Sequence, residues 1–122
     1  MNISNLFKLY NWVVVGDVTN QTKYAYRILN TLKSEKYNAA GVNPRGNGDG
    51  AFTSLKEVNF KIEVIDLCIN PVQGLEIIKE AKDMGIKNVL IQPGAESEEI
   101  LTYCKENEIN AIEGCVLRQL GY

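Results

Sequence analysis

The sequence predicts one α/β domain, in which a mainly parallel, five-stranded sheet is doubly wound with helices on both faces. Five short apolar runs alternate with amphipathic helical patterns, and this alternation is typical of βαβ units. The central runs are continuously apolar, as expected for strands that are covered on both faces. The chain of 122 residues suits a single domain, because no linker or internal repeat divides it.

The strands are expected at the short apolar runs. These runs are Trp12–Gly16, Asn38–Val42, Glu63–Ile69, Asn88–Gln92 and Asn110–Ile112. Helices are expected where apolar residues recur at positions i, i+3, i+4 and i+7. The helical stripes are Ala25, Ile28, Leu29 and Leu32, then Ile77, Ile78, Ala81 and Met84, and finally Ile100, Leu101 and Cys104.

Shorter elements complete the expected domain. A helical turn is expected after Ser54, which is a suitable N-cap, and a last short helix over Val116–Leu120. Residues 1–11 form an N-terminal extension, whose apolar residues either pack as an extra helix or contact a partner.

Composition and charge exclude several classes of function. The net charge of −2 argues against a general nucleic-acid binder, which needs a basic face. The chain has no run of about 18 apolar residues and no signal-peptide layout, so we expect a cytoplasmic protein without a membrane span. It contains no histidine, which excludes histidine-based catalysis and histidine metal sites. Its three widely spaced cysteines indicate reduced thiols, and we expect no bound metal.

A ligand is expected beyond the carboxyl ends of the strands, where open parallel sheets bind their ligands. Helix N-termini at this edge attract anions through their free N–H groups. The third helix opens with Glu96, Glu98 and Glu99, which cap it and repel a phosphate; metal binding by these acids is the less favoured alternative. The first helix is expected to begin at Val18, and the stretch up to Lys23 offers hydroxyls, amides and a cation. We therefore expect a phosphate at the first helix, the alternative being an ordinary polar loop.

The end of the second strand distinguishes between nucleotides. An NAD site needs an acid there to hold the ribose, whereas this chain has Asn43, Pro44 and Arg45 and no acid before Asp49. A guanidinium group pairs well with phosphate. The segment thus suits a ligand with a further phosphate near the ribose, such as coenzyme A (CoA) or NADP. The alternative is that Arg45 is a solvated loop charge.

Several segments together resemble the CoA-binding domain family of small stand-alone proteins. In chain order these are Gly16-Asp17-Val18 with Lys23–Arg27, Val42–Gly46, Ser54-Leu55, Val64–Leu67, Gln92–Glu96 and Gly114–Leu117. The order and spacing of the segments carry the resemblance, which covers nearly the whole chain. The family is similar to the CoA-binding domain of the succinyl-CoA synthetase α subunit.

The resemblance implies a Rossmann-like fold that binds CoA or an acyl-CoA. The first turn would hold the phosphates, the Asn-Pro-Arg segment would flank the adenosine, and the segments after the third and fourth strands would line the nucleotide and the pantetheine arm. The implied binding residues are Gly16, Asp17, Val18, Thr19, Lys23, Tyr24, Asn43, Pro44, Arg45, Asn70, Pro71, Val72, Gln92, Pro93, Gly94 and Cys115. The chain departs from the family pattern in the short loop that follows Gly46, and at Asn70, where many members have a basic residue.

Four side chains at this edge carry separate hypotheses. Asp66 lies inside an apolar strand, and we expect it to tie down loop amides near the first turn; a receiver-like phosphoacceptor is the alternative. Cys115 is either a small buried hydrophobe or a thiol close to the CoA sulfur that forms mixed disulfides. Of Tyr24 and Tyr26, one is expected to pack in the core and the other to cover the ligand.

These features favour a CoA-binding module without an evident catalytic activity of its own. Ligase chemistry in the larger relatives needs a phosphorylated histidine, which this chain lacks. The alternatives are a small enzyme that depends on NADP or another nucleotide, and a ligand-sensing protein with a protein partner. A homo-oligomer is left open. The Gly46–Gly50 loop is expected to become ordered on binding.

Overall fold

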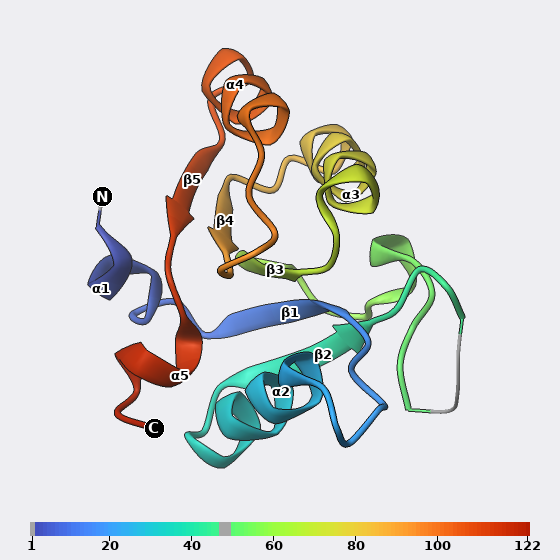
Figure 1. Cartoon of the computed structure of the whole chain (residues 1–122), viewed down its shortest axis with the longest axis vertical. Helices are drawn as coiled ribbons and strands as arrows, with labels where there is room; N and C mark the ends of the chain where they lie inside the picture. The colour runs from blue at the N-terminus through green and yellow to red at the C-terminus, as the bar shows by residue number, and fades with distance from the viewer. Residues whose placement is uncertain (1, 47–49) are drawn as a thin grey trace.

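The structure, a computed structural model, describes residues 2–46 and 50–122. Its strands are β1 (Asn11–Gly16), β2 (Asn38–Val42), β3 (Val64–Cys68), β4 (Asn88–Ile91) and β5 (Asn110–Glu113). Neighbouring strands all run parallel, in the order β2-β1-β3-β4-β5 (Figure 1). The predicted doubly wound α/β fold is confirmed, and each strand end lies within one residue of its predicted position.

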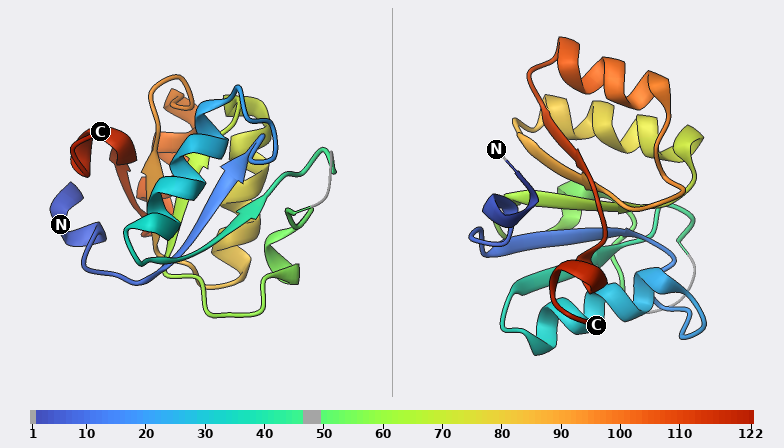
Figure 2. Two further views of the ribbon diagram at one scale, coloured as in Figure 1. Left: turned by 90° about the horizontal axis from the view of Figure 1, so that it is seen from below. Right: turned by 60° about the vertical axis from the view of Figure 1, so that its left-hand side comes forward.

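Helices cover both faces of this sheet (Figures 1 and 2). One face carries α1 (Ile3–Leu6), α2 (Tyr24–Ser34) and α5 (Val116–Gln119). The other carries the 3-10 turn η1 (Leu55–Glu57), α3 (Pro71–Asp83) and α4 (Glu98–Glu106). No helix in the described part of the chain is long and apolar enough to cross a membrane.

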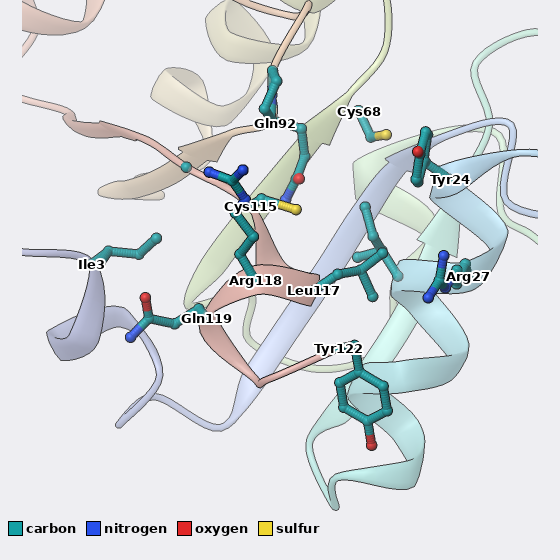
Figure 3. Close-up of a pocket in the computed structure, with 13 residues that line it drawn as sticks. Ile3, Tyr24, Arg27, Cys68, Gln92, Cys115, Leu117, Arg118, Gln119 and Tyr122 are labelled. Atoms are coloured by element: carbon teal, nitrogen blue, oxygen red, sulfur yellow. The ribbon is translucent and has the colours of Figure 1, made fainter.

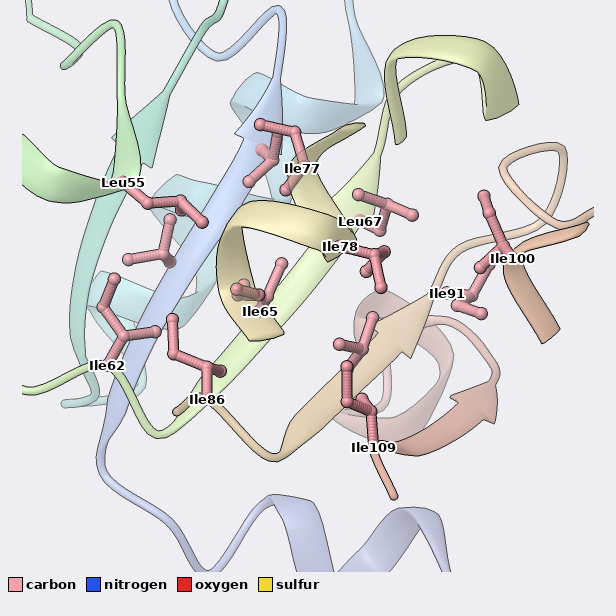
Figure 4. Close-up of a cluster of buried hydrophobic side chains, with 14 of the residues drawn as sticks. Leu55, Ile62, Ile65, Leu67, Ile77, Ile78, Ile86, Ile91, Ile100 and Ile109 are labelled. Carbon is pink, nitrogen blue, oxygen red and sulfur yellow. The ribbon is translucent and has the colours of Figure 1, made fainter. Parts of the chain in front are cut away.

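The central strand β1 explains why the apolar runs do not alternate with polar residues. Val13 and Val15 pack into the cluster beneath α3, whereas Trp12 and Val14 pack into the cluster beneath α2. All four side chains are fully buried. Burying a side chain of this size contributes roughly 1.5–3 kcal/mol, so both faces of the strand stabilise the fold. Figure 4 shows the cluster on the α3 side.

The strand order reverses next to β1, where β2 lies on one side and β3 on the other. The switch point, at which such sheets bind ligands, therefore lies between the carboxyl ends of β1 and β3. The two ends approach closely, because a Cβ atom on Gly16 would lie 2.3 Å from the carbonyl oxygen of Cys68. Close packing of the two strands thus requires the glycine that opens the first turn.

The helix that follows β1 is α2, which begins at Tyr24. The prediction that this helix begins at Val18 is therefore wrong. Asn20 organises the residues between them into a turn. Its side-chain oxygen accepts hydrogen bonds from the N–H of Thr22 at 3.0 Å and from the Thr22 hydroxyl at 2.7 Å. The N–H of Lys23 donates to the Asn20 carbonyl at 3.0 Å. Asparagine side chains compete with helical hydrogen bonding in this way, which delays the helix until Tyr24.

Two predictions of burial, one for Tyr24 or Tyr26 and one for Met84, are not met in the structure. Tyr24 is 70% exposed and Tyr26 is only half-buried, so the expectation that one of them packs in the core is wrong. Met84 is 39% exposed, because α3 ends at Asp83 and Met84 is its C-cap. The periodicity of the second stripe continues past the end of its helix.

The N-terminal extension packs onto the domain through its apolar residues. Leu6 is fully buried, and the ring centroids of Phe7 and Trp12 lie 4.8 Å apart. The indole N–H of Trp12 donates to the carbonyl oxygen of Leu9 at 2.9 Å. Tyr10, in contrast, is 59% exposed. The extension thus forms a short helix that belongs to the core on the α2 face.

Candidate functional site

Two adjoining cavities open at the carboxyl edge of the sheet. The larger cavity, of about 730 Å³, lies between α2 and α5 and reaches the segment that follows β4 (Figure 3). The smaller cavity, of about 310 Å³, lies between the first turn, the end of β2 and the end of β3. Tyr24 and Cys68 line both cavities, so a single extended ligand could pass from one into the other.

The structure brings most of the predicted binding segments to these cavities. The smaller cavity is lined by the predicted residues Asp17, Lys23, Tyr24, Asn43, Arg45 and Asn70. The larger cavity is lined by the predicted residues Tyr24, Gln92, Pro93 and Cys115. Segments that are far apart in the sequence therefore meet at one edge of the sheet.

Other predicted residues lie beside the cavities or away from them. Val18 is 2% exposed and packs in the core, whereas Val72 is 80% exposed. Pro44 lines a separate cavity near α3. Pro71 is the first residue of α3. Gly94 lines neither cavity, and its N–H donates to the Glu96 carboxylate at 2.9 Å. Neither Gly16 nor Thr19 lines either cavity.

The start of α2 leaves its backbone N–H groups open toward the smaller cavity. Lys23 occupies the N-cap position with an extended backbone, and among the described residues no side chain caps the helix. No acidic residue lies in the first turn of α2. The positive end of the helix dipole and the Lys23 ammonium group therefore act on the same space.

The starts of α3 and α4 are closed by their own side chains. The Asn70 oxygen accepts a hydrogen bond from the N–H of Gln73 at 2.9 Å, and Ser97 Oγ accepts one from the N–H of Ile100 at 3.2 Å. Two glutamates also occupy the first turn of α4, as the sequence predicted. Of these three helix starts, α2 is the one that has no side-chain cap in the described part of the chain and no acidic residue in its first turn.

Arg45 is held at the smaller cavity by a tight turn. The turn runs from Asn43 to Gly46, whose N–H donates to the Asn43 carbonyl at 3.0 Å, and Pro44 stands at its second position. Arg45 Nη2 donates to Gln73 Oε1 at 3.1 Å. The partner is a neutral amide, so the charge of the guanidinium stays available for an anion. Residues 47–49, and with them the predicted ordering of the Gly46–Gly50 loop, lie outside the described residues.

Asp66 lies beneath the larger cavity and is fully buried in β3. Its Oδ1 accepts a hydrogen bond of 2.5 Å from Gln92 Nε2, while Oδ2 has no partner among the described residues. Burial raises the pKa of Asp66 and the hydrogen bond from Gln92 offsets part of the rise, so the pKa lies at about 7. The expectation that Asp66 ties down loop amides is wrong: it anchors the Gln92 side chain, which lines the cavity.

The two cysteines of the larger cavity differ in chemical character. Burial, together with the nearby Asp66 and Cys115, raises the pKa of Cys68 to about 12. Cys68 is therefore a poor nucleophile. Cys115 is half-buried at the N-cap of α5, which leaves its thiol within reach of the cavity (Figure 3). No group of histidine, cysteine or acidic residues in the described ranges could hold a metal ion.

The sequence did not reveal several residues that line the larger cavity. Arg27 and Arg118 come from α2 and α5, and Tyr122 follows α5. One signal was present, because Arg27 lies three residues after Tyr24 and Arg118 three residues after Cys115, on the same helix faces. Which helices face each other across the cavity is a property of the tertiary packing. With these residues, four basic side chains and one acidic side chain among the described residues line the two cavities.

Comparisons with known proteins agree with this arrangement. A conserved hypothetical protein from Pyrococcus furiosus is 31% identical, with a TM-score of 0.82 over 91% of this chain and 99% of its own. A hypothetical protein from Pyrococcus horikoshii (23% identity, TM-score 0.85, 95% of this chain and 84% of its own) shares the fold. So does a protein from Thermus thermophilus (20% identity, TM-score 0.80, 93% and 91%). None of the curated proteins compared with this chain matches it. The model of the CoA-binding domain family matches residues 10–120, and the chain therefore belongs to this family.

Proposed function

We propose that the protein binds CoA or an acyl-CoA across the two adjoining cavities and carries out no reaction of its own. The diphosphate lies at the start of α2, the adenosine with its 3′-phosphate lies beside Asn43 and Arg45, and the pantetheine arm extends past Tyr24 into the larger cavity. The observation that carries this proposal is the meeting of an uncapped helix start, Lys23 and Arg45 around one cavity.

The charge of the two cavities supports this binding mode. CoA carries about four negative charges at neutral pH, on its diphosphate and its 3′-phosphate. The cavities collect cationic side chains although the chain as a whole has a net charge of −2. Open backbone N–H groups and a guanidinium bind phosphate oxygens through charge-assisted hydrogen bonds. The charge is thus placed where a polyanionic nucleotide would need it.

The shape of the cavities supports an elongated ligand with a polar end and an apolar end. Their volumes of about 730 and 310 Å³ together suit a ligand of the size of CoA. The larger one is flanked by the apolar side chains of Ile28 and Leu117, and by Gln92, an amide that suits the amide groups of pantetheine.

The groups that line the cavities support the part of the proposal that assigns no reaction to the protein. Asp66 is buried beneath Gln92, and the raised pKa of Cys68 makes its thiol a weak nucleophile. With no histidine in the chain, the described lining offers no pair of groups arranged for general acid and base catalysis.

The test is a calorimetric titration of CoA, dephospho-CoA, NADP and ATP against the protein. We expect CoA to bind, and dephospho-CoA to bind at least about tenfold more weakly, because the 3′-phosphate loses its pair with Arg45. Arg45→Gln should abolish this difference, whereas Lys105→Gln, on the remote helix α4, should retain it. Tight NADP binding without CoA binding would show that the proposal is wrong.

A further inference from the structure

Gln73 holds the Arg45 side chain from outside the ligand cavities. Arg45 lines the smaller cavity, whereas Gln73 lines the separate cavity near α3 that Pro44 also borders. The Oε1 atom of Gln73 accepts a hydrogen bond from Arg45 Nη2 at 3.1 Å. This bond uses a single N–H donor of the guanidinium, so the remaining donors can bind an anion. Gln73 therefore acts on the smaller cavity through Arg45.

The side chain of Gln73 is itself fixed at the start of α3. Asn70 Oδ1 accepts a hydrogen bond from the N–H of Gln73 at 2.9 Å, and Asn70 Nδ2 donates to Gln73 Oε1 at 2.6 Å. A carbonyl oxygen has two lone pairs, so Gln73 Oε1 can accept from Asn70 and from Arg45 at once. Because the Asn70 amide bonds to Gln73 through both of its polar atoms, the acceptor that meets Arg45 has a defined position.

The bond between Arg45 and Gln73 joins two segments that flank the switch point of the sheet. Arg45 follows β2, whereas Gln73 belongs to α3, which follows β3, and these two strands lie on opposite sides of β1. Arg45 is exposed, and an exposed arginine samples many rotamers that a bound phosphate would have to restrict. The bond to Gln73 orders the guanidinium before a ligand arrives.

The neutral charge of Gln73 matters as much as its position. A carboxylate at the same place would form a charge-assisted pair with the guanidinium and would repel a phosphate beside it. The amide accepts the same hydrogen bond but leaves the positive charge of Arg45 uncompensated. Within the described part of the chain, Arg45 takes part in no ion pair.

Building on the proposed function, we propose that Gln73 is a positioning residue that orients Arg45 toward the 3′-phosphate and thereby sets the discrimination between CoA and dephospho-CoA. Gln73 itself does not contact the ligand. Asn70 contributes indirectly, because it holds the Gln73 amide in place. The inference assigns a specificity role to a residue that lines neither ligand cavity.

The test measures by calorimetry the ratio of the dissociation constants of dephospho-CoA and CoA, which we expect to be at least about ten in the wild type. Gln73→Met keeps the length of the side chain but removes the acceptor. This variant should lower the ratio by about fivefold, because the phosphate must then order Arg45 itself. In an Arg45→Gln background, the matched control, Gln73→Met should leave the ratio unchanged.

Gln73→Glu separates a role in positioning from a role in stability. Glutamate retains an acceptor for Asn70 and adds an acid to the first turn of α3, so the free energy of unfolding in urea should not fall. The same variant should reduce the ratio to about one, because the carboxylate pairs with Arg45 and repels the 3′-phosphate. A residue that served the fold alone would not show this loss of discrimination in a fully stable protein.

The outcomes separate this inference from the proposed function. If the wild type discriminates between the two ligands and both Gln73 variants retain its ratio, the inference is wrong and the proposed function stands. A higher ratio in Gln73→Met would show that Gln73 competes with the phosphate for Arg45, which also overturns the inference. If CoA binds without any discrimination, Arg45 does not hold the 3′-phosphate and the inference is again wrong. If CoA does not bind, the proposed function itself fails.

Discussion

The starts of α2 and α4 lie at the same edge of one sheet but differ in what they can bind. α4 is capped by Ser97, carries two glutamates in its first turn, and follows a turn in which Glu96 accepts the N–H of Gly94. α2 begins at an uncapped Lys23 with no acid nearby in its first turn. The difference teaches that phosphate binding at such an edge depends on which helix leaves its N–H groups open, and the number of glycines in the turn does not decide it.

Asp66 extends the comparison to a carboxylate that the fold does not satisfy fully. Its pKa rises to about 7 in the folded protein, from an ordinary value of 3.8, so the folded state binds more protons than the unfolded state between these pH values. Stability is therefore full at low pH and falls as pH rises toward 7. Between pH 5 and pH 8 we expect a loss of about 3 kcal/mol relative to Asp66→Asn, measured by urea unfolding. An equal pH slope in both proteins would contradict the assignment.

Lys23→Asp makes the start of α2 resemble the start of α4. The new carboxylate caps the helix, so we expect the free energy of unfolding to rise by about 1 kcal/mol. The same charge repels the ligand, so CoA affinity should fall by about 100-fold, because one cation is lost and one anion gained beside the phosphates. Calorimetry and urea unfolding measure the two effects. CoA affinity within twofold of the wild type would place the phosphates elsewhere.

Cysteine labelling compares the two regions through their thiols. Cys115 lines the larger cavity, whereas Cys104 is buried in α4, and burial raises the pKa of Cys104 to about 11. Treated with iodoacetamide at pH 8, where about one in a thousand Cys104 thiols is ionised, Cys115 should react first. CoA should slow the labelling of Cys115 by about tenfold and leave Cys104 unaffected, as peptide mass spectrometry can show. A labelling rate of Cys115 that does not change with CoA would contradict the proposed position of the pantetheine arm in this cavity.

Ser97→Ala is the smallest change and affects the α4 side alone. The N–H of Ile100 loses its acceptor, so we expect the free energy of unfolding to fall by about 1 kcal/mol. CoA affinity should stay within twofold of the wild type, because the proposed phosphate site lies at the start of α2. Thermal unfolding and calorimetry on the same samples give both numbers. A large loss of affinity would show that the two helix starts do not act separately.

The sequence predicts the parts of this comparison that depend on local patterns. The alternation of strands and helices gave the fold, since buried parallel strands read as continuous apolar runs. The acids at Glu96, Glu98 and Glu99 marked the α4 start as closed. The positions of Asp17, Lys23 and Arg45 at one cavity followed from the rule that parallel strands end at one edge.

The remaining features depend on contacts that the sequence pattern does not contain. The sequence pattern predicts the start of α2 too early. The side-chain hydrogen bonds of Asn20 form a turn where the pattern predicts a helix. The partner of Asp66 is Gln92, which lies 26 residues further along the chain. Arg27 and Arg118 meet at one cavity only because α5 packs beside α2. Each of these features is set by tertiary packing.

The central claim concerns the backbone N–H groups at the start of α2, and NMR observes them directly. The measurement is a titration of the 15N-labelled protein with CoA, in which the amide signals of Tyr24, Ala25 and Tyr26 are compared with those of Glu98 and Glu99. The account predicts large, saturable shifts at the start of α2 and shifts near zero at the start of α4. Large shifts at α4 with none at α2 would contradict it.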